Sequence, residues 1–335
     1  MSARGVCSGS AVALCCVLTC STASAQITES TGSRALGMGG AFVAVASDSS
    51  AIWWNPAGLA AGPFLDLAVS RTVTGTRDEL PARRETVTGF ALATPPLGIA
   101  YSRFSVTSAS PIGPTGTDGA GREDDETGVP IQMLSGSQIG VTFVQSLTWG
   151  VHAGATVKFV RGTPHSGIGG RQATPSELLE TAEALPEGSS SRAFDLDVGL
   201  LAVAGPLRLG ARVRNLFEPE FDHIRLPRQT RVGIAFDPEL TTGIPLTVAI
   251  DADVDAYTTL TGERRVVAVG AEYWALSKRV GVRAGGRVNT VGARERAATA
   301  GASVAVRPGI YVDAYAVGGG AGDERGWGLA TRVSF

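Results

Sequence analysis

The stretch from residue 149 to residue 162 reads WGVHAGATVKFVRG. Apolar side chains occupy every second position, and small or polar residues fill the positions between them. The apolar set is Val151, Ala153, Ala155, Val157 and Phe159. Successive side chains of a β-strand point to opposite faces, so this alternation predicts a strand with one apolar and one polar face.

The same pattern recurs along the chain and predicts fourteen strands in all. Their ranges are 64–73, 85–95, 97–106, 136–148, 149–162, 192–205, 206–216, 227–237, 245–257, 264–276, 278–290, 295–307, 309–319 and 326–335. Short connections alternate with long ones, the longest being 107–135 and 163–191. An even number of strands with two kinds of connection predicts an antiparallel meander whose two ends differ.

Charged residues gather on the polar face, and this decides which face points inward. We expect the following residues to line a polar lumen: Asp195, Asp197, Arg208, Arg212, Arg214, Asp251, Asp253, Asp255, Arg279, Arg283 and Arg287. An outer-membrane barrel places apolar residues toward lipid and polar residues toward its lumen, and closure satisfies every backbone group. The prediction is an all-β, 14-stranded antiparallel transmembrane β-barrel. A soluble β-sandwich or β-helix is the alternative, but it explains neither the loop asymmetry nor the C-terminus.

The first 25 residues have the features of a secretory signal peptide. Arg4 is their only charge, the apolar run AVALCCVLTC follows, and small residues at Ala23 and Ala25 predict cleavage before Gln26. All four cysteines lie in this segment, so the mature chain has neither a disulfide nor a thiolate metal site. A lipoprotein anchored through Cys20 is the less favoured alternative.

The chain ends in WGLATRVSF, an alternating strand that finishes on an aromatic residue. Trp327, Leu329, Val333 and Phe335 form a pattern that resembles the signal read by the outer-membrane assembly machinery. With the signal peptide, this predicts the outer membrane of a Gram-negative bacterium, and membrane lipid and the assembly machinery as partners.

The composition argues against several other functions. The net charge of −2 gives no electrostatic footprint for nucleic acid. The three histidines are widely spaced, and no nucleophile, base and orienting group can be nominated together. We therefore expect no enzyme, no cofactor and no metal.

Residues 26–62 lack the strand pattern of the predicted barrel, residues 63–335. They are too few for a core of their own, and fourteen strands enclose a lumen that side chains alone cannot fill. The segment is therefore expected to plug the lumen. Within WWNPAG, Pro56 suits a first helical position with Asn55 as its cap. Trp53 and Trp54 would then face different walls.

The run GSRALGMGGAFVAVASDSSAIWWNPAGLA, residues 32–60, resembles the N-terminal hatch of the FadL/TodX-like outer-membrane transporters. That family has a fourteen-stranded barrel and moves hydrophobic compounds such as fatty acids or aromatic hydrocarbons. The resemblance implies passive diffusion of a small hydrophobic ligand, gated by the hatch. It implies hatch or gate roles for Gly37, Gly39, Gly40, Phe42, Asp48, Trp53, Trp54, Asn55, Pro56 and Ala57.

The same residues also resemble the Por-type barrels linked to type IX secretion, which share RALGMGGAF and NPAGLA. That resemblance implies the alternative function, a non-transporting barrel that acts as partner or shuttle of secretion-system proteins. The charged residues predicted to line the lumen do not suit a purely apolar tunnel.

The long connection 163–191 contains a helix signal, TPSELLETAEAL. Thr174, Pro175 and Glu177 form a capping box with proline in the first turn, and Leu178, Leu179, Ala182 and Leu185 share one face. Such a helix either covers the pore mouth or packs on the barrel rim. The acidic run REDDE, residues 122–126, is expected to be a solvated external loop.

Overall fold

A computed structural model describes residues 23–24, 31–76, 78–110, 128–221, 224–259, 262–292, 294–320 and 323–335. The predicted signal peptide lies outside these residues, except for Ala23–Ser24, which form the short strand β1. The run 122–126 also lies outside them. Among the described residues, no helix combines the length and the apolar character needed to cross a membrane.

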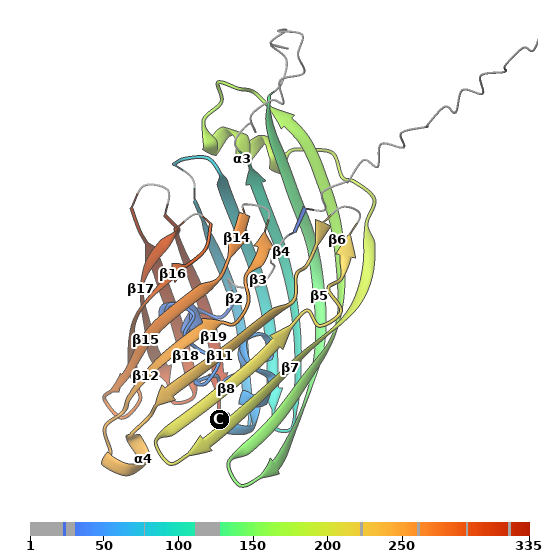
Figure 1. Ribbon diagram of the computed structural model, residues 1–335. Helices are drawn as coiled ribbons and strands as arrows, with labels where there is room; N and C mark the ends of the chain where they lie inside the picture. Colours follow the sequence, from blue (N-terminus) through green and yellow to red (C-terminus); the bar gives the residue numbers. More distant parts are fainter. Residues whose placement is uncertain are drawn as a thin grey trace, which may run out of the picture.

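The fold is a closed barrel of fourteen antiparallel strands (Figure 1). The strands are β2 Asp66–Thr76, β3 Ala82–Thr94, β4 Leu97–Ala109, β5 Val129–Thr148, β6 Val151–Gly169, β7 Ser191–Ala204, β8 Leu207–Arg214, β11 Gln229–Phe236, β12 Leu246–Asp253, β15 Val266–Ala275, β16 Val280–Asn289, β17 Arg296–Arg307, β18 Ile310–Gly318 and β19 Arg325–Ser334. Each overlaps one predicted strand, and the pairing of β19 with β2 closes the barrel. The predicted fold class is confirmed.

The remaining elements are short. Strands β9 (Glu220–Phe221) and β10 (Ile224–Arg225) lie between β8 and β11, and β13 (Tyr257–Thr259) pairs with β14 (Gly262–Arg264). The helices are α1 Ser33–Gly37, α2 Ala51–Trp54, the 3-10 helix η1 Pro56–Ala61, α3 Pro175–Glu183 and α4 Glu239–Thr242.

The polarity of the barrel is inverted relative to a soluble protein. On β15, Glu272 is buried, whereas its neighbour Tyr273 is 43% exposed. Apolar side chains of the other strands are exposed in the same alternating way, as at Val69, Ile99, Phe159, Val282 and Leu329. An apolar outside and a polar inside are what a barrel in lipid requires.

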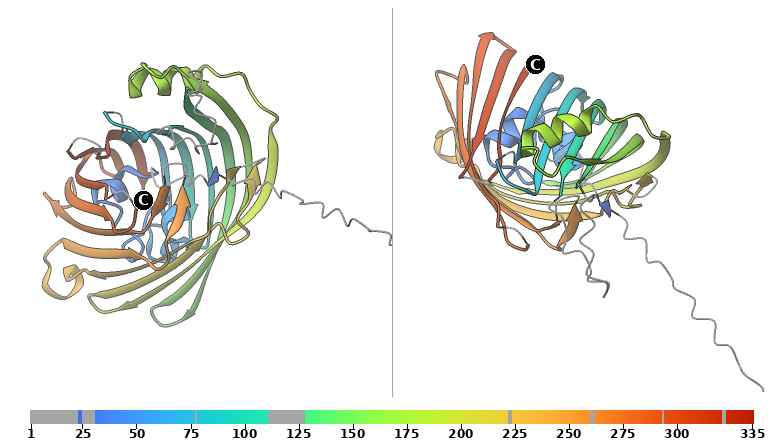
Figure 2. Two further views of the ribbon diagram at one scale, coloured as in Figure 1. Left: turned by 45° about the horizontal axis from the view of Figure 1, so that its top comes forward. Right: turned by 90° about the horizontal axis from the view of Figure 1, so that it is seen from above.

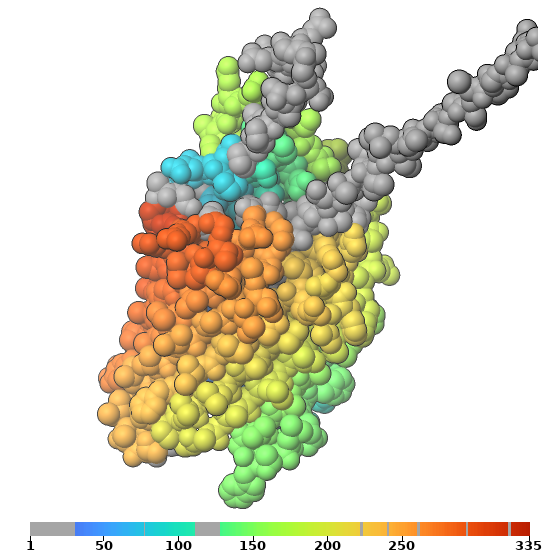
Figure 3. Space-filling view, viewed as in Figure 1, coloured from blue at the N-terminus to red at the C-terminus, as the bar shows by residue number. Residues whose placement is uncertain are grey.

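The two ends of the barrel differ as predicted (Figures 1 and 2). Short turns join the strands at one end, while the connections that carry α3 and the β9–β10 pair lie at the other. Helix α4 is the longer exception among the short turns. In the space-filling view the β5–β6 hairpin projects beyond the other turns (Figure 3), and Trp149 at its tip is fully exposed.

Helix α3 forms as the capping box predicts. The Thr174 amide donates to Glu177 Oε2 at 2.7 Å, and the Glu177 amide donates to Thr174 Oγ1 at 3.3 Å. These bonds from Thr174 lower the pKa of Glu177.

Helix α3 packs on the barrel rim rather than over its mouth. Leu178, Leu179 and Ala182 contact a cluster formed by Ala82, Ala109, Val129 and Ile131. Strand alternation places these four on the outward face, because Val87, Phe104, Val106 and Leu134 are buried on the inward one.

Candidate functional site

The N-terminal residues 31–62, here called the plug, lie inside the barrel (Figures 1 and 2, blue). Helix α1 packs against β16, β17 and β18, and η1 packs against β5, β6 and β7. The plug therefore reaches from one wall of the barrel to another, and nearly every residue from 32 to 59 is buried.

The two adjacent tryptophans face different neighbours. Trp54 donates its Nε1–H to the Thr31 carbonyl at 2.8 Å and packs edge-on against Phe42, so it faces the rest of the plug. Trp53 lies against the wall, where a Cβ at Gly89 would stand 3.4 Å from its ring.

Asn55 and Asp251 tie the plug to the wall. Asn55 caps η1 by accepting from the Ala57 amide at 3.2 Å, and Pro56 opens that helix. The side-chain amide of Asn55 donates through Nδ2 to the carbonyls of Val43 and of Leu200 on β7, at 2.8 and 2.9 Å. The carboxylate of Asp251 accepts from the amides of Phe42 and Val43 at 2.7 and 2.8 Å.

The plug lies against wall glycines, here called the glycine belt: Gly154, Gly199, Gly210, Gly233, Gly270 and Gly285. They stand directly opposite one another as Gly154–Gly199, Gly210–Gly233 and Gly270–Gly285. A Cβ at Gly154 would lie 2.4 Å from the Ala57 amide nitrogen, and one at Gly210 would lie 2.5 Å from the Val43 carbonyl oxygen. Only glycine permits so close an approach.

The plug glycines complete the contact from the other side. Gly39 and Gly40 adopt φ values of 70° and 85°, in the left-handed region that favours glycine. A Cβ at Gly37 would lie 3.2 Å from Gly301 Cα, and one at Gly39 would lie 2.7 Å from the Gly286 nitrogen.

A series of buried ion pairs, here called the charge chain, joins the plug to several strands. It runs through Asp48, Arg34, Glu272, Arg283, Asp313, Arg332 and Asp66, with successive distances of 3.3, 2.7, 2.9, 3.9, 3.3 and 3.5 Å. Burial opposes ionisation of Asp48, but Arg34 and Arg332 outweigh it and hold its pKa below the usual value. Positive and negative side chains alternate along the charge chain, so each buried charge has a partner of opposite sign.

Most residues predicted to line the lumen are buried inside the barrel. Asp253 pairs with Arg231 at 2.6 Å, Arg287 pairs with Glu324 at 2.5 Å, and Arg212 donates to the Trp53 carbonyl at 2.9 Å. Arg214 donates to the same carbonyl, Asp195 and Asp197 pair with Lys158 at 3.0 and 2.7 Å, and the half-buried Arg208 pairs with Asp237 at 2.5 Å. Several of these pairs join neighbouring strands along the inner wall, and Arg212 and Arg214 join the wall to the plug.

Two predicted lumen residues lie elsewhere. Arg279 is exposed in the turn between β15 and β16, and Asp255 is exposed beyond the end of β12. The prediction was wrong for both because the strands end at Ala275 and Asp253, so the alternation does not extend to these positions. The predicted assembly residues Trp327, Leu329 and Phe335 are exposed, and Val333 is partly buried.

One inner wall is apolar. The inward side chains of Val87, Phe104, Val106, Leu134 and Val160 form a cluster on β3 to β6. Phe221, Ile224 and Leu226, from the segment between β8 and β11, cover this cluster. The polar lumen expected from the sequence therefore describes only part of the interior.

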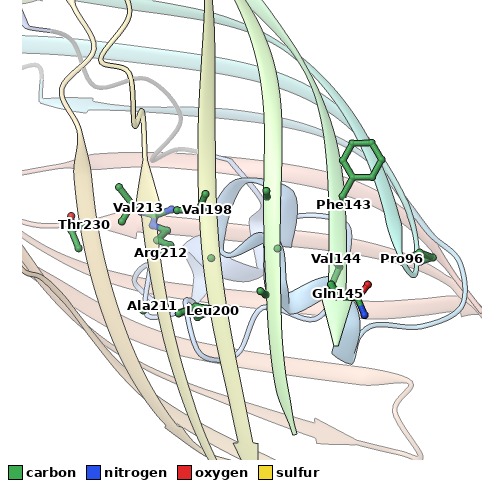
Figure 4. Close-up of a pocket in the computed structure, with 14 residues that line it drawn as sticks. Pro96, Phe143, Val144, Gln145, Val198, Leu200, Ala211, Arg212, Val213 and Thr230 are labelled. Carbon is green, nitrogen blue, oxygen red and sulfur yellow. The ribbon is translucent and has the colours of Figure 1, made fainter. Parts of the chain in front are cut away.

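A hollow of about 770 Å³, here called the wall groove, lies over β5 to β8 and β11 (Figure 4). Its outward lining is apolar: Phe143, Ala153, Ala155, Val198, Leu200, Ala211 and Val213. The alanines leave the hollow between the larger side chains. Gly154 and Gly199 form its floor, with Asn55 and Pro56 directly behind them. At this point a strand backbone without side chains separates the groove from the plug.

Other residues of the site could not be identified from the sequence. The charge chain depends on four residues that were not predicted: Arg34, Glu272, Asp313 and Arg332. For the last three, an inward position on a strand is the only sequence signal that could have indicated a role in the lumen. Among the described residues, no group of three or more His, Cys, Asp or Glu is arranged to hold a metal ion.

Comparison with known proteins gives one family match. Residues 82–279 match the sequence profile of the family described as "F plasmid transfer operon, TraF, protein". The chain belongs to this family. No curated protein matches it.

Two solved structures share the fold across nearly the whole chain. The toluene transporter TodX of Pseudomonas putida is 12% identical, with 93% of this chain and 98% of that chain covered, at a TM-score of 0.54. The CymD monoaromatic hydrocarbon channel is 13% identical, with 93% and 99% covered, at 0.61. Both likenesses are of fold, and the fourteen-stranded barrel that the resemblance of residues 32–60 implied is present.

Proposed function

We propose that this chain is an outer-membrane channel through which small hydrophobic molecules diffuse passively, with the plug as its gate. The wall groove carries this proposal. It offers an apolar ligand about 770 Å³ beside the lipid, and only the backbone at Gly154 and Gly199 parts it from the plug. The apolar cluster on the inner side of β3 to β6 supplies a matching surface on the lumen side.

The channel is closed in this conformation. Lys158, Asp195 and Asp197 form a buried ion-paired group beside the apolar cluster, and Asn55 binds both the plug and β7. Passage of a ligand therefore requires the plug near residues 55–57 to move. Two structures with the same fold, a toluene transporter and a monoaromatic hydrocarbon channel, support the choice of a hydrophobic ligand.

Filling the groove tests the proposal. Ala153→Phe and Ala211→Phe place bulk in the hollow on the lipid-facing side, where a larger apolar side chain is compatible with the barrel. Ala316→Phe, at an exposed outward position of β18, is the matched control. Uptake of a labelled monoaromatic hydrocarbon or fatty acid by whole cells should fall for the first two variants and stay at the wild-type rate for the third. Equal uptake by all three variants and the wild type would remove the groove from the route.

The second candidate is a non-transporting barrel that serves as partner or shuttle of secretion-system proteins. The closed lumen favours it, because the charge chain and the glycine belt hold the plug firmly in place. Co-purification of the intact chain with secretion proteins, together with uptake no greater than that of an empty vector, would favour this function over the first.

A further inference from the structure

The barrel closes where its last strand meets its first. Strands β19 and β2 pair from Ser334 opposite Asp66 to Arg325 opposite Gly75. Two further backbone bonds, between Leu65 and Phe335 at 3.0 and 2.9 Å, extend this seam to the end of the chain. Nearly the whole barrel sequence separates the two strands, so this pairing is the least local in the fold.

The plug touches this seam directly. The Ser49 amide donates to Asp66 Oδ1 at 2.9 Å, and Arg332 of β19 reaches Asp66 Oδ2 at 3.5 Å. Asp66 therefore joins the plug, the first strand and the last strand. Residues of all three elements, among them Asp48, Ser70 and Arg332, line one cavity of about 20 Å³ at the seam.

The other part of the plug is bound to the C-terminal strands. Arg34 pairs with Glu272 of β15 at 2.7 Å, and Thr299 of β17 donates its hydroxyl to the Gly37 carbonyl at 3.0 Å. Helix α1 packs against β17 and β18. The chain then runs through η1 into β2, which begins at Asp66.

We propose that the plug clamps the barrel seam, holding β2 against β19 in addition to any role in gating. Without the plug, pairing β2 with β19 closes a loop that spans the whole barrel sequence. Once the plug is bound to β15–β18, pairing closes only the short stretch from α1 to β2. A shorter loop loses less entropy on closure, so the plug favours the closed seam. Ser49 then binds Asp66 of β2 from inside, while Arg332 of β19 pairs with the other oxygen of the same carboxylate.

The test compares two plug variants of the full chain. Asp48→Ala removes the carboxylate that pairs with Arg34 and lines the same small cavity as Arg332 of β19. Asn55→Ala removes a plug contact at β7, away from the seam. Each is made with and without a cross-seam disulfide between Ser70→Cys and Ala330→Cys, which stand directly opposite each other. The four natural cysteines all lie within residues 1–20, so a chain cleaved at the predicted site contains only the engineered pair.

The readout is the temperature at which the fast-migrating folded form disappears from an unboiled SDS gel. Asp48→Ala should lower this temperature, and the oxidised disulfide should restore it, while reduction should abolish the rescue. The disulfide should leave the effect of Asn55→Ala in place. If Asp48→Ala alone yields no folded form, the disulfide-bearing variant decides the matter in the same way.

Three results would overturn the clamp. Asp48→Ala could match the wild type, or the oxidised disulfide could fail to restore Asp48→Ala. The disulfide could also restore Asn55→Ala to the same degree, which would show general reinforcement rather than repair of the seam.

Discussion

The glycine belt makes the sharpest prediction, because one methyl group should displace the plug. A Cβ at Gly285 would lie 2.3 Å from the Met38 carbonyl carbon and 2.5 Å from the Gly39 nitrogen, and both are backbone atoms that cannot rotate away. Overpacking of this kind costs about 1–3 kcal/mol. Taking about 2 kcal/mol, Gly285→Ala should raise the population with an unseated plug about 30-fold.

Labelling of a buried reporter cysteine measures that population. Ser33→Cys places the reporter at a buried position of α1, and a membrane-impermeant maleimide reaches it only when the plug leaves its seat. Gly318→Ala is the matched control, because a Cβ at that position meets nothing within 4 Å. Labelling should accelerate about 30-fold in Gly285→Ala and stay unchanged in Gly318→Ala. Wild-type labelling in both variants would refute the argument that the plug needs bare backbone beneath it.

Three further predictions concern the plug and α3. Asn55→Ala with Pro56→Ala should loosen the plug and speed labelling of the Ser33→Cys reporter, while heat-modifiable gel mobility is kept; complete loss of that mobility would contradict a gate that the barrel can do without. Because Arg34 and Arg332 hold the pKa of Asp48 below the usual aspartate value of about 4, its contribution to stability is present above that pH and is lost as the pH falls through the lowered pKa. On unboiled gels, the difference in melting temperature between wild type and Asp48→Asn should therefore be constant from about pH 7 to 5 and should disappear as the pH falls below about 4. A difference that disappears near neutral pH would be inconsistent with this. Thr174→Ala should destabilise α3 by about 1 kcal/mol and hasten proteolysis within residues 163–191, with no change in barrel melting.

The strands were predictable because lipid and lumen impose opposite demands on alternate residues. The signal fades where those demands change. Strands β5 and β6 extend to Val129 and Gly169, beyond the predicted 136–148 and 149–162. There Val129 and Ile131 are covered by α3 instead of facing lipid. Arg279 and Asp255 fail for a related reason, since the alternation was extended past the strand ends.

The site was less predictable than the barrel because its contacts join distant parts of the chain. Asn55 and Pro56 were assigned correctly as cap and first helical residue, since that geometry is local. Arg34 and Glu272 are 238 residues apart, and no local pattern pairs them. The sequence shows the belt glycines as small residues on the polar face. Their contact with the plug is known only from the structure.

Uptake by intact cells tests the central claim most directly. Gram-negative cells that lack a channel of their own would express the full chain or carry an empty vector, and both would receive a labelled hydrophobic compound without an energy source. Passive passage predicts that the initial rate rises with the amount of folded barrel and persists when the cells are de-energised. A rate equal to that of the empty vector, at verified levels of folded barrel, would contradict the channel.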